Sequence, residues 1–385
     1  MSLSLLDTPL AEIRHALHAA PELSGDESRT ATRVADWLEQ AGADRVLRGL
    51  GGHGVAGVFR GAEPGPRVML RAELDGLPIR EAAGTAWRSR HDAVAHSCGH
   101  DGHMSALLGV AQRLARQRPR SGEVVLLFQP AEETGDGAGR IVDAAAFAEI
   151  RPDFVYAMHN LPGRPLGEVS VRPGAFSCAS RGLTVRLNGL CAHAAHPEQG
   201  RSPAMAMCRI LQGLKRLPQQ LPDDLGLVMI TLIHARLGEV AFGTSPGQAE
   251  VMATLRTASD DMMRALAEAS VSLVRAEAEE EQLGVEIDWS DVFSATVNAP
   301  AAVEVIESVA GSLDMPVHRL DEAHRWSEDF GVLLACGEGA MFTLGSGEQC
   351  RPLHHPAYDF PDELLERAVD LFHGLVEHHL GRASA

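Results

Sequence analysis

Five side chains that could bind a metal ion or move a proton fall within residues 95–103 of this sequence: a thiol, three imidazoles and a carboxylate. Cys98 and His100 are two residues apart, so on a loop their side chains can converge on one ion. A thiolate beside a neutral imidazole is a borderline-soft ligand pair suited to zinc and its neighbours. A lone buried cysteine usually behaves as a small apolar residue. The density of this segment, directly before an apolar helical run, instead favours a metal site.

Further candidate ligands come directly after segments with the composition of buried strands. The predicted strands 68–70, 123–128 and 154–158 are followed respectively by Glu73 and Asp75, by Glu132 and Glu133, and by His159. Ligands of α/β sheets bind at the carboxyl ends of the strands, so a site role for Asp75 is favoured over a solvated turn. For Glu73 both interpretations stay open.

The elements that must position these side chains alternate between helix and strand. Helices are expected at 10–17, 27–41 and 104–114, with Ser24 and Asp26 as candidate caps of the second. Near-continuous apolar runs such as 123–128 are typical of strands buried on both faces. This pattern predicts an α/β fold with a mostly parallel central sheet flanked by helices.

The pattern changes from Cys178 to about Ile287, where strands and helices have an α+β arrangement. The flanking pattern resumes near Asn298, and a last amphipathic helix is expected at 362–379. We therefore predict a discontinuous metal-binding catalytic domain, residues 1–177 and 295–385, with a smaller α+β domain, residues 178–294, inserted into it. At 385 residues the chain is longer than a single core usually supports.

Composition and charge exclude several classes of partner. The chain has 52 acidic and 34 basic residues, a formal net charge of -18, which opposes binding to nucleic acid or to an anionic membrane. No signal-peptide pattern or membrane-length apolar stretch is present. Its six cysteines show no disulfide spacing. We expect a soluble cytoplasmic protein with reduced thiols.

Eight motifs together resemble the metal-dependent aminoacylase and carboxypeptidase family, in particular the amidohydrolase branch with the hippurate and auxin-conjugate hydrolases. The resemblance covers nearly the whole chain. In order, the motifs are His18-x-x-Pro21-Glu22-Leu23, Arg71-Ala72-Glu73-Leu74-Asp75, Cys98-Gly99-His100-Asp101-Gly102-His103, Phe128-Gln129-Pro130-Ala131-Glu132-Glu133, Met158-His159-Asn160, His193-Ala194-Ala195, Ser327-Glu328-Asp329-Phe330 and Leu353-His354-His355-Pro356.

The resemblance implies two divalent metal ions per chain, zinc or manganese, and a site that divides the chemistry among named residues. The implied metal ligands are Cys98, His100, Glu133, His159 and His354. Glu132 is the implied general base for a metal-bridged water, and Asp75 orients a ligand, His100. His355 and His103 are then structural residues or supports of the ligands.

The inserted domain resembles the family's lid and dimerisation domain. The resemblance implies a homodimer in which His193 enters the partner's active site and stabilises the tetrahedral oxyanion. The sequence departs from the family pattern at Cys191-Ala192, where many relatives have Gly-Gly, and at residues 242–246, where an Asn that contacts the substrate carboxylate is missing. Arg256 keeps a family-like position and could bind that carboxylate. Glu73 also departs, because Asp is commoner there.

The implied function is hydrolysis of the amide bond of N-acyl amino acids or small dipeptide-like conjugates. One alternative is a catalytically silent metal-binding protein that retained the fold, although the presence of Glu132 disfavours it. A redox role for Cys98 is another alternative, but no resolving cysteine is near it in sequence. The acyl group, the amino acid and the native metal are left open.

Overall fold

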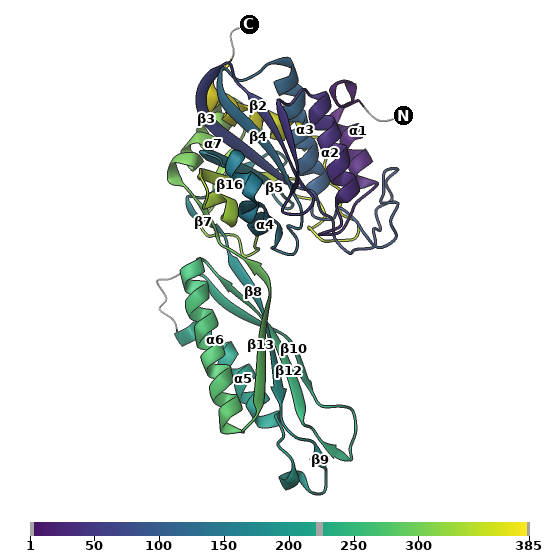
Figure 1. Ribbon diagram of the computed structural model, residues 1–385, viewed down its shortest axis with the longest axis vertical. Helices are drawn as coiled ribbons and strands as arrows, with labels where there is room; N and C mark the ends of the chain where they lie inside the picture. The colour runs from purple at the N-terminus through teal and green to yellow at the C-terminus, as the bar shows by residue number, and fades with distance from the viewer. Residues whose placement is uncertain (1–3, 221–225, 383–385) are drawn as a thin grey trace. The chain divides into compact units, whose positions relative to one another are not determined.

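A computed structural model describes residues 4–220 and 226–382, which form two compact units (Figure 1). One unit contains residues 4–176, 296–322 and 329–382, and the other contains 177–220, 226–295 and 323–328. The sequence alone placed 323–328 with the first domain. Backbone contacts hold this segment in the second unit: the N–H of Cys178 donates to the carbonyl of Trp326 at 3.1 Å, and Ser177 forms a parallel bridge with His324.

The first unit is built on an eight-stranded sheet with the order β1-β2-β4-β3-β5-β16-β6-β15. Its strands are β1 (Arg45–Leu50), β2 (Gly54–Arg60), β3 (Glu63–Glu73), β4 (Ser121–Gln129), β5 (Phe154–Leu161), β6 (Val169–Val171), β15 (Val317–Arg319) and β16 (Glu338–Gly345). The four central strands β4, β3, β5 and β16 run parallel, whereas β1 with β2, β2 with β4, and β6 with β16 are antiparallel. The predicted α/β fold with a mostly parallel sheet is confirmed.

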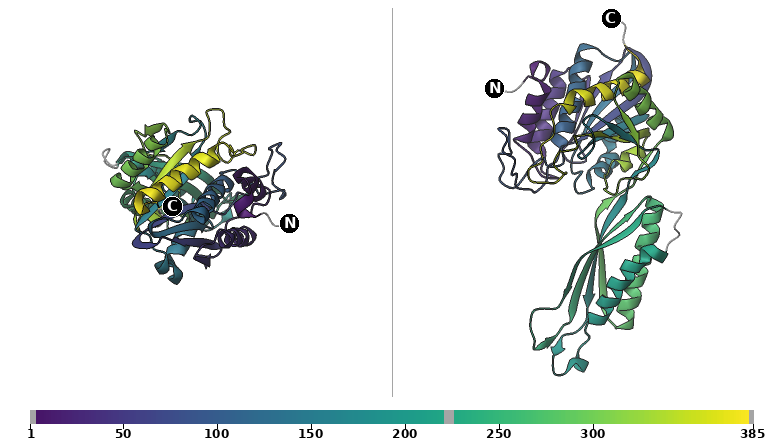
Figure 2. Two further views of the ribbon diagram at one scale, coloured as in Figure 1. Left: turned by 90° about the horizontal axis from the view of Figure 1, so that it is seen from above. Right: turned by 180° about the vertical axis from the view of Figure 1, so that it is seen from behind.

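Helices cover both faces of this sheet. They are α1 (Leu10–His18), α2 (Ser28–Gln40), α3 (His100–Arg116), α4 (Gly137–Asp143), α7 (Pro300–Ser312), α8 (Gly331–Leu334) and α9 (Leu364–Leu380), with 3-10 turns η1 (Leu5–Asp7) and η2 (Ala145–Glu149). One apolar cluster joins α1, α2, α3, α7 and α9 to the sheet. Figure 2 shows the yellow helix α9 beside the purple amino-terminal helices on that face. The short helices α4 and α8 contact β4 and β16 apart from this cluster.

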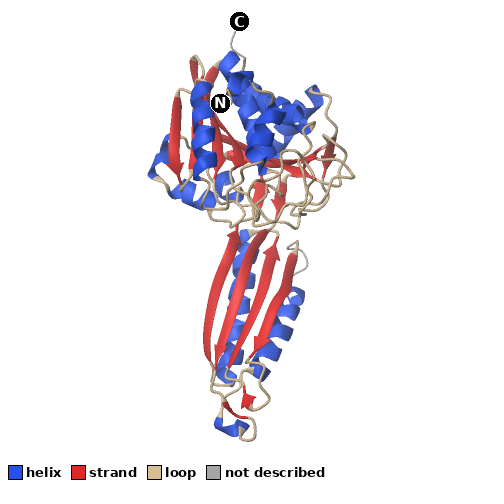
Figure 3. Cartoon of the chain, turned by 90° about the vertical axis from the view of Figure 1, so that its right-hand side faces the viewer, coloured by secondary structure: helices blue, strands red, loops and turns tan. Residues whose placement is uncertain are grey.

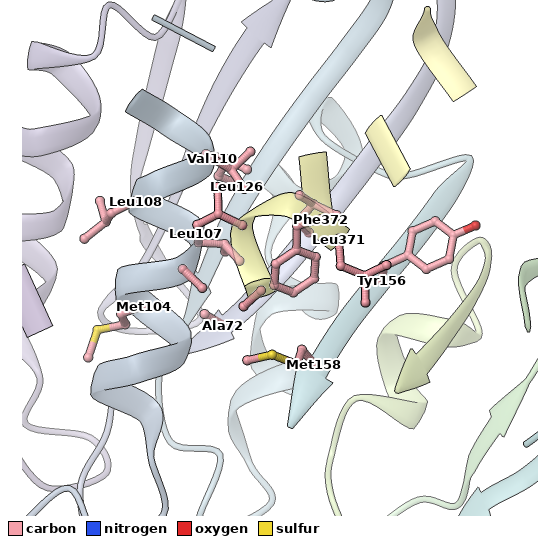
Figure 4. Close-up of a cluster of buried hydrophobic side chains, with 14 of the residues drawn as sticks. Ala72, Met104, Leu107, Leu108, Val110, Leu126, Tyr156, Met158, Leu371 and Phe372 are labelled. Atoms are coloured by element: carbon pink, nitrogen blue, oxygen red, sulfur yellow. The ribbon is translucent and has the colours of Figure 1, made fainter. Parts of the chain in front are cut away.

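Alternation along β4 explains why both faces are covered. Val124, Leu126 and Phe128 belong to the main apolar cluster, while Val125 and Leu127 are equally buried but lie outside it. Successive side chains of a strand point to opposite faces, so a continuous apolar run needs a cover on each side. Figure 4 shows side chains of α3 and α9 packed over the strands in the main cluster.

The second unit is a four-stranded antiparallel sheet with the order β10-β12-β8-β13 and two long helices on one face (Figure 3). Its elements are β8 (Ala179–Asn188), β9 (Ala192–His193), η3 (Pro197–Gln199), α5 (Ala204–Arg216), η4 (Leu217–Gln220), β10 (Val228–Leu237), β11 (Thr244–Ser245), β12 (Gln248–Thr257), α6 (Asp260–Glu280) and β13 (Gly284–Phe293). The strands β7 (Gly174–Ser177) and β14 (Thr296–Asn298) pair where the chain passes from one unit to the other. Every second residue of β12 is buried, which is the pattern of a sheet covered on one face.

Among the described residues, no helix has both the length and the apolar composition needed to cross a membrane.

We expect Leu107→Ala to lower the free energy of unfolding of the first unit by about 2–5 kcal/mol, because Leu107 is fully buried in the main cluster and its loss leaves a cavity. Urea unfolding followed by circular dichroism measures the change. Leu166→Ala, at an exposed position, is the control and should change the value by no more than about 0.5 kcal/mol. Equal effects of the two variants would contradict the assigned core.

Candidate metal centre

A tight turn brings the first two candidate ligands to the start of α3. Gly99 has φ +100°, and a Cβ at this position would lie 2.5 Å from Oδ1 of Asn160. Both the left-handed backbone and the close approach therefore require glycine. The helix begins at the next residue, so Cys98 and His100 lie on either side of the turn, and both are buried.

Candidate donor atoms from four separate segments converge beside this turn. The Sγ of Cys98 lies 3.4 Å from Nε2 of His159, which is near the carboxyl end of β5. Oxygens of Glu133, after β4, lie 3.8 Å from Nε2 of His100 and 3.7 Å from Nε2 of His354. Two donor atoms that each lie about 2.0–2.3 Å from one tetrahedral ion are roughly 3.5 Å from each other. The separations of these donor atoms are close to that value. The five predicted ligands are therefore brought together.

Backbone carbonyls orient two of the imidazoles. Nδ1 of His100 lies 2.8 Å from the carbonyl oxygen of Asp75, and Nδ1 of His159 lies 2.8 Å from the carbonyl oxygen of Asn160. A carbonyl can only accept, so each Nδ1 carries the proton and each Nε2 of the neutral ring is left with its lone pair. The Nε2 of His100 is buried without a hydrogen-bond partner among the described residues. Such an orphaned donor atom fits a metal ligand.

The surroundings of the donors are strongly negative. Burial raises the pKa of the Cys98 thiol, and nearby carboxylates raise it further: those of Glu133, Glu132 and Glu73. Burial alone would lower the pKa of His100, but neighbouring carboxylates outweigh it and raise that pKa to about 10: those of Glu73, Asp75 and Glu133. Each of these shifts reports a field that stabilises positive charge. A divalent cation would supply that charge and allow the thiol to ionise, so the residues present fit a metal site.

The predicted general base lies next to this cluster. Glu132 is buried, and its Oε2 lies 3.8 Å from Nε2 of His100. Its neighbour Glu133 places one oxygen toward His100 and the other toward His354. The adjacent glutamates therefore occupy different positions: Glu133 lies between His100 and His354, and Glu132 lies beside His100.

Asp75 contacts two of the candidate ligands. Its carbonyl holds His100, while its carboxylate is 3.6 Å from the same ring and accepts the backbone N–H of Glu133 at 3.0 Å. Ser24 donates its hydroxyl to the same carboxylate oxygen at 2.7 Å. Ser24 is thus not the predicted cap of α2, because its side chain is directed to Asp75. Among the described residues, Glu22 instead accepts the N–H of Thr30 in the first turn of that helix.

Two residues at the site have left-handed backbones although they are not glycine. His354 has φ +64° and Ala131, which precedes Glu132, has φ +51°. Such strain persists where the surrounding contacts impose it, and it concentrates at functional sites. The backbone N–H of His354 donates to the carbonyl of Ser97 at 2.8 Å. His355 accepts the N–H of Ala357 on its Nδ1, a local contact within its own turn.

Buried polar residues surround the ligands. The sequence indicated His103 as a structural residue or support and left Glu73 open, but it did not identify roles for Asn160 and Tyr358. Glu73 accepts a hydrogen bond from Nδ1 of His103 at 2.7 Å and pairs with Arg71. His103 also lies 2.6 Å from Oδ1 of Asn160, whose amide donates to the hydroxyl of Tyr358. Of the two interpretations left open for Glu73, these contacts favour a support for the histidines over a solvated turn. The sequence signal was its position at the end of a buried strand.

Two further predicted site residues lie in the second unit. His193 ends β9 and is exposed, and its Nδ1 accepts the N–H of Ala195 at 3.1 Å. Arg256 on β12 is half-buried and donates through Nη1 to the carbonyl of Arg325 and to the hydroxyl of Ser327, at 2.9 and 2.8 Å. These contacts position both side chains within their own unit.

Comparison with known proteins gives consistent matches along almost the whole chain. The model of the peptidase family M20/M25/M40 matches residues 69–378. An N-acetyldiaminopimelate deacetylase of Geobacillus thermodenitrificans is 31% identical over 367 residues, 94% of this chain and 95% of that protein. A hippurate hydrolase of Campylobacter jejuni is 29% identical over 372 residues, 96% of each chain.

A solved structure shares the fold at the same coverage. The Bacillus subtilis protein YXEP, described as a dinuclear metal-binding peptidase of the M20 family, superposes with a TM-score of 0.82 at 25% identity, over 97% of this chain and 98% of that one. The family resemblance drawn from the eight motifs is confirmed.

We expect Cys98→Ala to reduce bound divalent metal by at least about half after dialysis, because the substitution removes one donor from a convergent set. Elemental analysis of purified protein measures the occupancy. Cys208→Ala, an exposed cysteine in the second unit, is the control. Unchanged occupancy in Cys98→Ala would remove the thiol from the ligand set.

Proposed function

This chain belongs to the peptidase family M20/M25/M40, and we infer that it is a metal-dependent hydrolase of N-acyl amino acids or small dipeptide-like conjugates. The observation that carries this inference is the convergence of the five donor side chains, with the Glu132 carboxylate next to them at 3.8 Å from Nε2 of His100. Relatives named for an N-acetyl compound and for hippurate support an amide substrate. A catalytically silent protein is disfavoured by the same relatives, which are named as hydrolases.

We assign two divalent ions per chain, zinc or manganese, to Cys98, His100, Glu133, His159 and His354. Metal ions in such a site supply an acidified water and a Lewis acid for the scissile carbonyl. The thiol and imidazoles favour zinc, while the carboxylate also suits manganese. A cytoplasmic location completes the proposal, supported by six free cysteines.

Glu132 is assigned as the general base and acid. It takes a proton from the attacking water and gives it to the leaving nitrogen, a role that needs a carboxylate near the ligands and not held by them. Its burial limits competition from bulk water. Asp75 acts indirectly, since it holds the His100 ring through its carbonyl and the Glu133 backbone through its carboxylate.

His193 is assigned to oxyanion stabilisation in a homodimer, acting on the partner's site. Because its Nδ1 accepts the Ala195 N–H, the neutral ring carries its proton on Nε2, where it can donate to a developing negative oxygen. A second copy has a suitable surface to bind: β10 is an edge strand of its sheet and carries exposed apolar residues, Leu232, Ile233 and Leu237. Arg256 is assigned to the substrate carboxylate.

We expect Glu132→Gln to keep bound metal but lose at least about a hundredfold in kcat, because the amide cannot accept the water's proton. N-acetyl and N-benzoyl amino acids are the substrates, assayed with added zinc, manganese or cobalt. Glu133→Gln is the comparison, since loss of a ligand should first lower metal occupancy. Full turnover in Glu132→Gln would place the base elsewhere.

We expect an equal mixture of His193→Ala and Glu132→Gln chains to recover roughly a quarter of wild-type activity, because about half of the dimers form as heterodimers and each heterodimer has one complete site of two. The two inactive chains are refolded together and assayed. The control is a mixture of Glu132→Gln chains with chains that carry both substitutions, which should recover no activity because no chain has Glu132. No recovery in the first mixture, or an active monomer by light scattering, would contradict action in trans.

A further inference from the structure

The segment 22–27 between α1 and α2 is fastened to the loop that follows β3. The backbone N–H of Gly76 donates to the carbonyl of Glu22 at 2.8 Å, and Leu23 forms a parallel bridge with the same glycine. The hydroxyl of Ser24 donates to the carboxylate of Asp75 at 2.7 Å. The segment therefore has a fixed position beside the candidate metal centre.

The same segment contacts the loop that follows β4 through one buried carboxylate. Glu27 is completely buried, and its Oε1 accepts two backbone N–H groups at 2.8 Å each, from Gly25 and from Ala131. The first contact ties the carboxylate to its own segment. The second ties it to the residue immediately before Glu132.

The residue that Glu27 holds is strained. Ala131 has φ +51°, a left-handed backbone that is unfavourable for a residue with a Cβ. The N–H of Ala131 donates to Oε1 of Glu27 at 2.8 Å in this conformation, so this acceptor offsets part of the cost. Loss of this acceptor would remove the hydrogen bond that the Ala131 N–H makes in this conformation.

Backbone contacts on both sides then confine Glu132. The N–H before it, of Ala131, donates to Glu27, and the N–H after it, of Glu133, donates to Asp75 at 3.0 Å. The carbonyl of Glu132 accepts the N–H of Gly135 at 2.8 Å and closes the turn. Two buried carboxylates from different parts of the chain thus determine how the peptide carrying Glu132 is oriented.

We propose that Glu27 is a positioning residue, whose bond to the Ala131 N–H fixes the peptide before Glu132 and so aims the Glu132 carboxylate at the reacting water. This inference rests on the proposed function, in which Glu132 is the base. Small displacements of a catalytic group are costly, and about 1 Å can cost a hundredfold in rate. Glu27 itself needs only an acceptor oxygen at the right distance.

An amide of the same length should therefore replace Glu27, while a shorter carboxylate should not. Burial and the charge of Asp75 raise the pKa of Glu27, so a neutral side chain suits the site. The Oε2 of Glu27 has no hydrogen-bond partner among the described residues, and an amide nitrogen there breaks no existing bond. Glu27→Asp keeps the carboxylate but withdraws it from Ala131 by one methylene.

We expect Glu27→Asp to lower kcat by about tenfold or more, with KM within about twofold of wild type and metal content unchanged. The acid limb of its kcat–pH profile should move by about half a pH unit or more. Glu27→Gln should keep kcat within about threefold of wild type. Glu22→Asp is the matched control, because Glu22 is also a buried glutamate of the segment 22–27 but its side chain bonds to Arg29 and Thr30 in the first turn of α2. It should lower the melting temperature without moving the profile.

The outcomes separate this inference from the function on which it rests. If Glu27→Asp keeps kcat and pH profile while Glu132→Gln is inactive, the positioning role is wrong and the base assignment stands. Equal losses of kcat in Glu27→Asp and Glu22→Asp, with no change in either pH profile, would also overturn it in favour of a purely structural role. Turnover by Glu132→Gln would instead refute the proposed base. The Asp and Gln pair decides the question even if Glu27→Ala does not fold.

Discussion

The concentration of buried negative charge at the carboxyl ends of β3 and β4 is the constraint on which the site depends. Glu73, Asp75 and Glu132 are all buried there. Burial raises the pKa of the neighbouring Cys98 thiol, and the charges of Glu133, Glu132 and Glu73 raise that pKa further. Burying carboxylates without compensation is costly. Arg71 compensates part of this charge through bonds to Glu73 and Asp329. The remaining field favours a cation, which explains why the same cluster that would be costly in an ordinary core suits a metal centre.

Buried hydrogen bonds within the first unit fix the start of α3, which carries the ligand His100. Asp101, next to His100, accepts bonds from the buried side chains of Arg14 and His18, at 3.0 and 2.8 Å. Burial disfavours the charged form of Asp101, but these two partners keep its pKa below the usual range. The first motif of the sequence, which contains His18, is thus a contact to the ligand-bearing helix. A helix anchored in this way limits the movement of His100.

Strained backbone at two loops shows where packing overrides local preference. Ala131 and His354 have left-handed φ angles, and each donates its N–H to an acceptor in a distant segment, Glu27 and Ser97 respectively. Glycine would reach these angles at lower cost. In the native chain, the hydrogen bonds to these distant acceptors stabilise the left-handed conformations instead. The positions of Glu132 and of the His354 ring therefore depend on contacts that lie far away in sequence.

The sequence by itself determined the α/β class and the parallel central strands, because apolar runs identify buried strands. It also placed candidate side chains at the ends of those strands, Asp75, Glu132 with Glu133, and His159, while the choice of Glu133 over Glu132 as a ligand came from the family resemblance. It also pointed to His354, but only through the family motif. Only the tertiary structure decided that Ser24 binds Asp75 instead of capping α2, that residues 323–328 pack with the second unit, and that Glu27 holds Ala131. The physical reason is that these contacts join segments roughly 50 to 150 residues apart through isolated hydrogen bonds. Such bonds have no periodicity that a sequence can reveal, whereas burial repeats along every strand and helix.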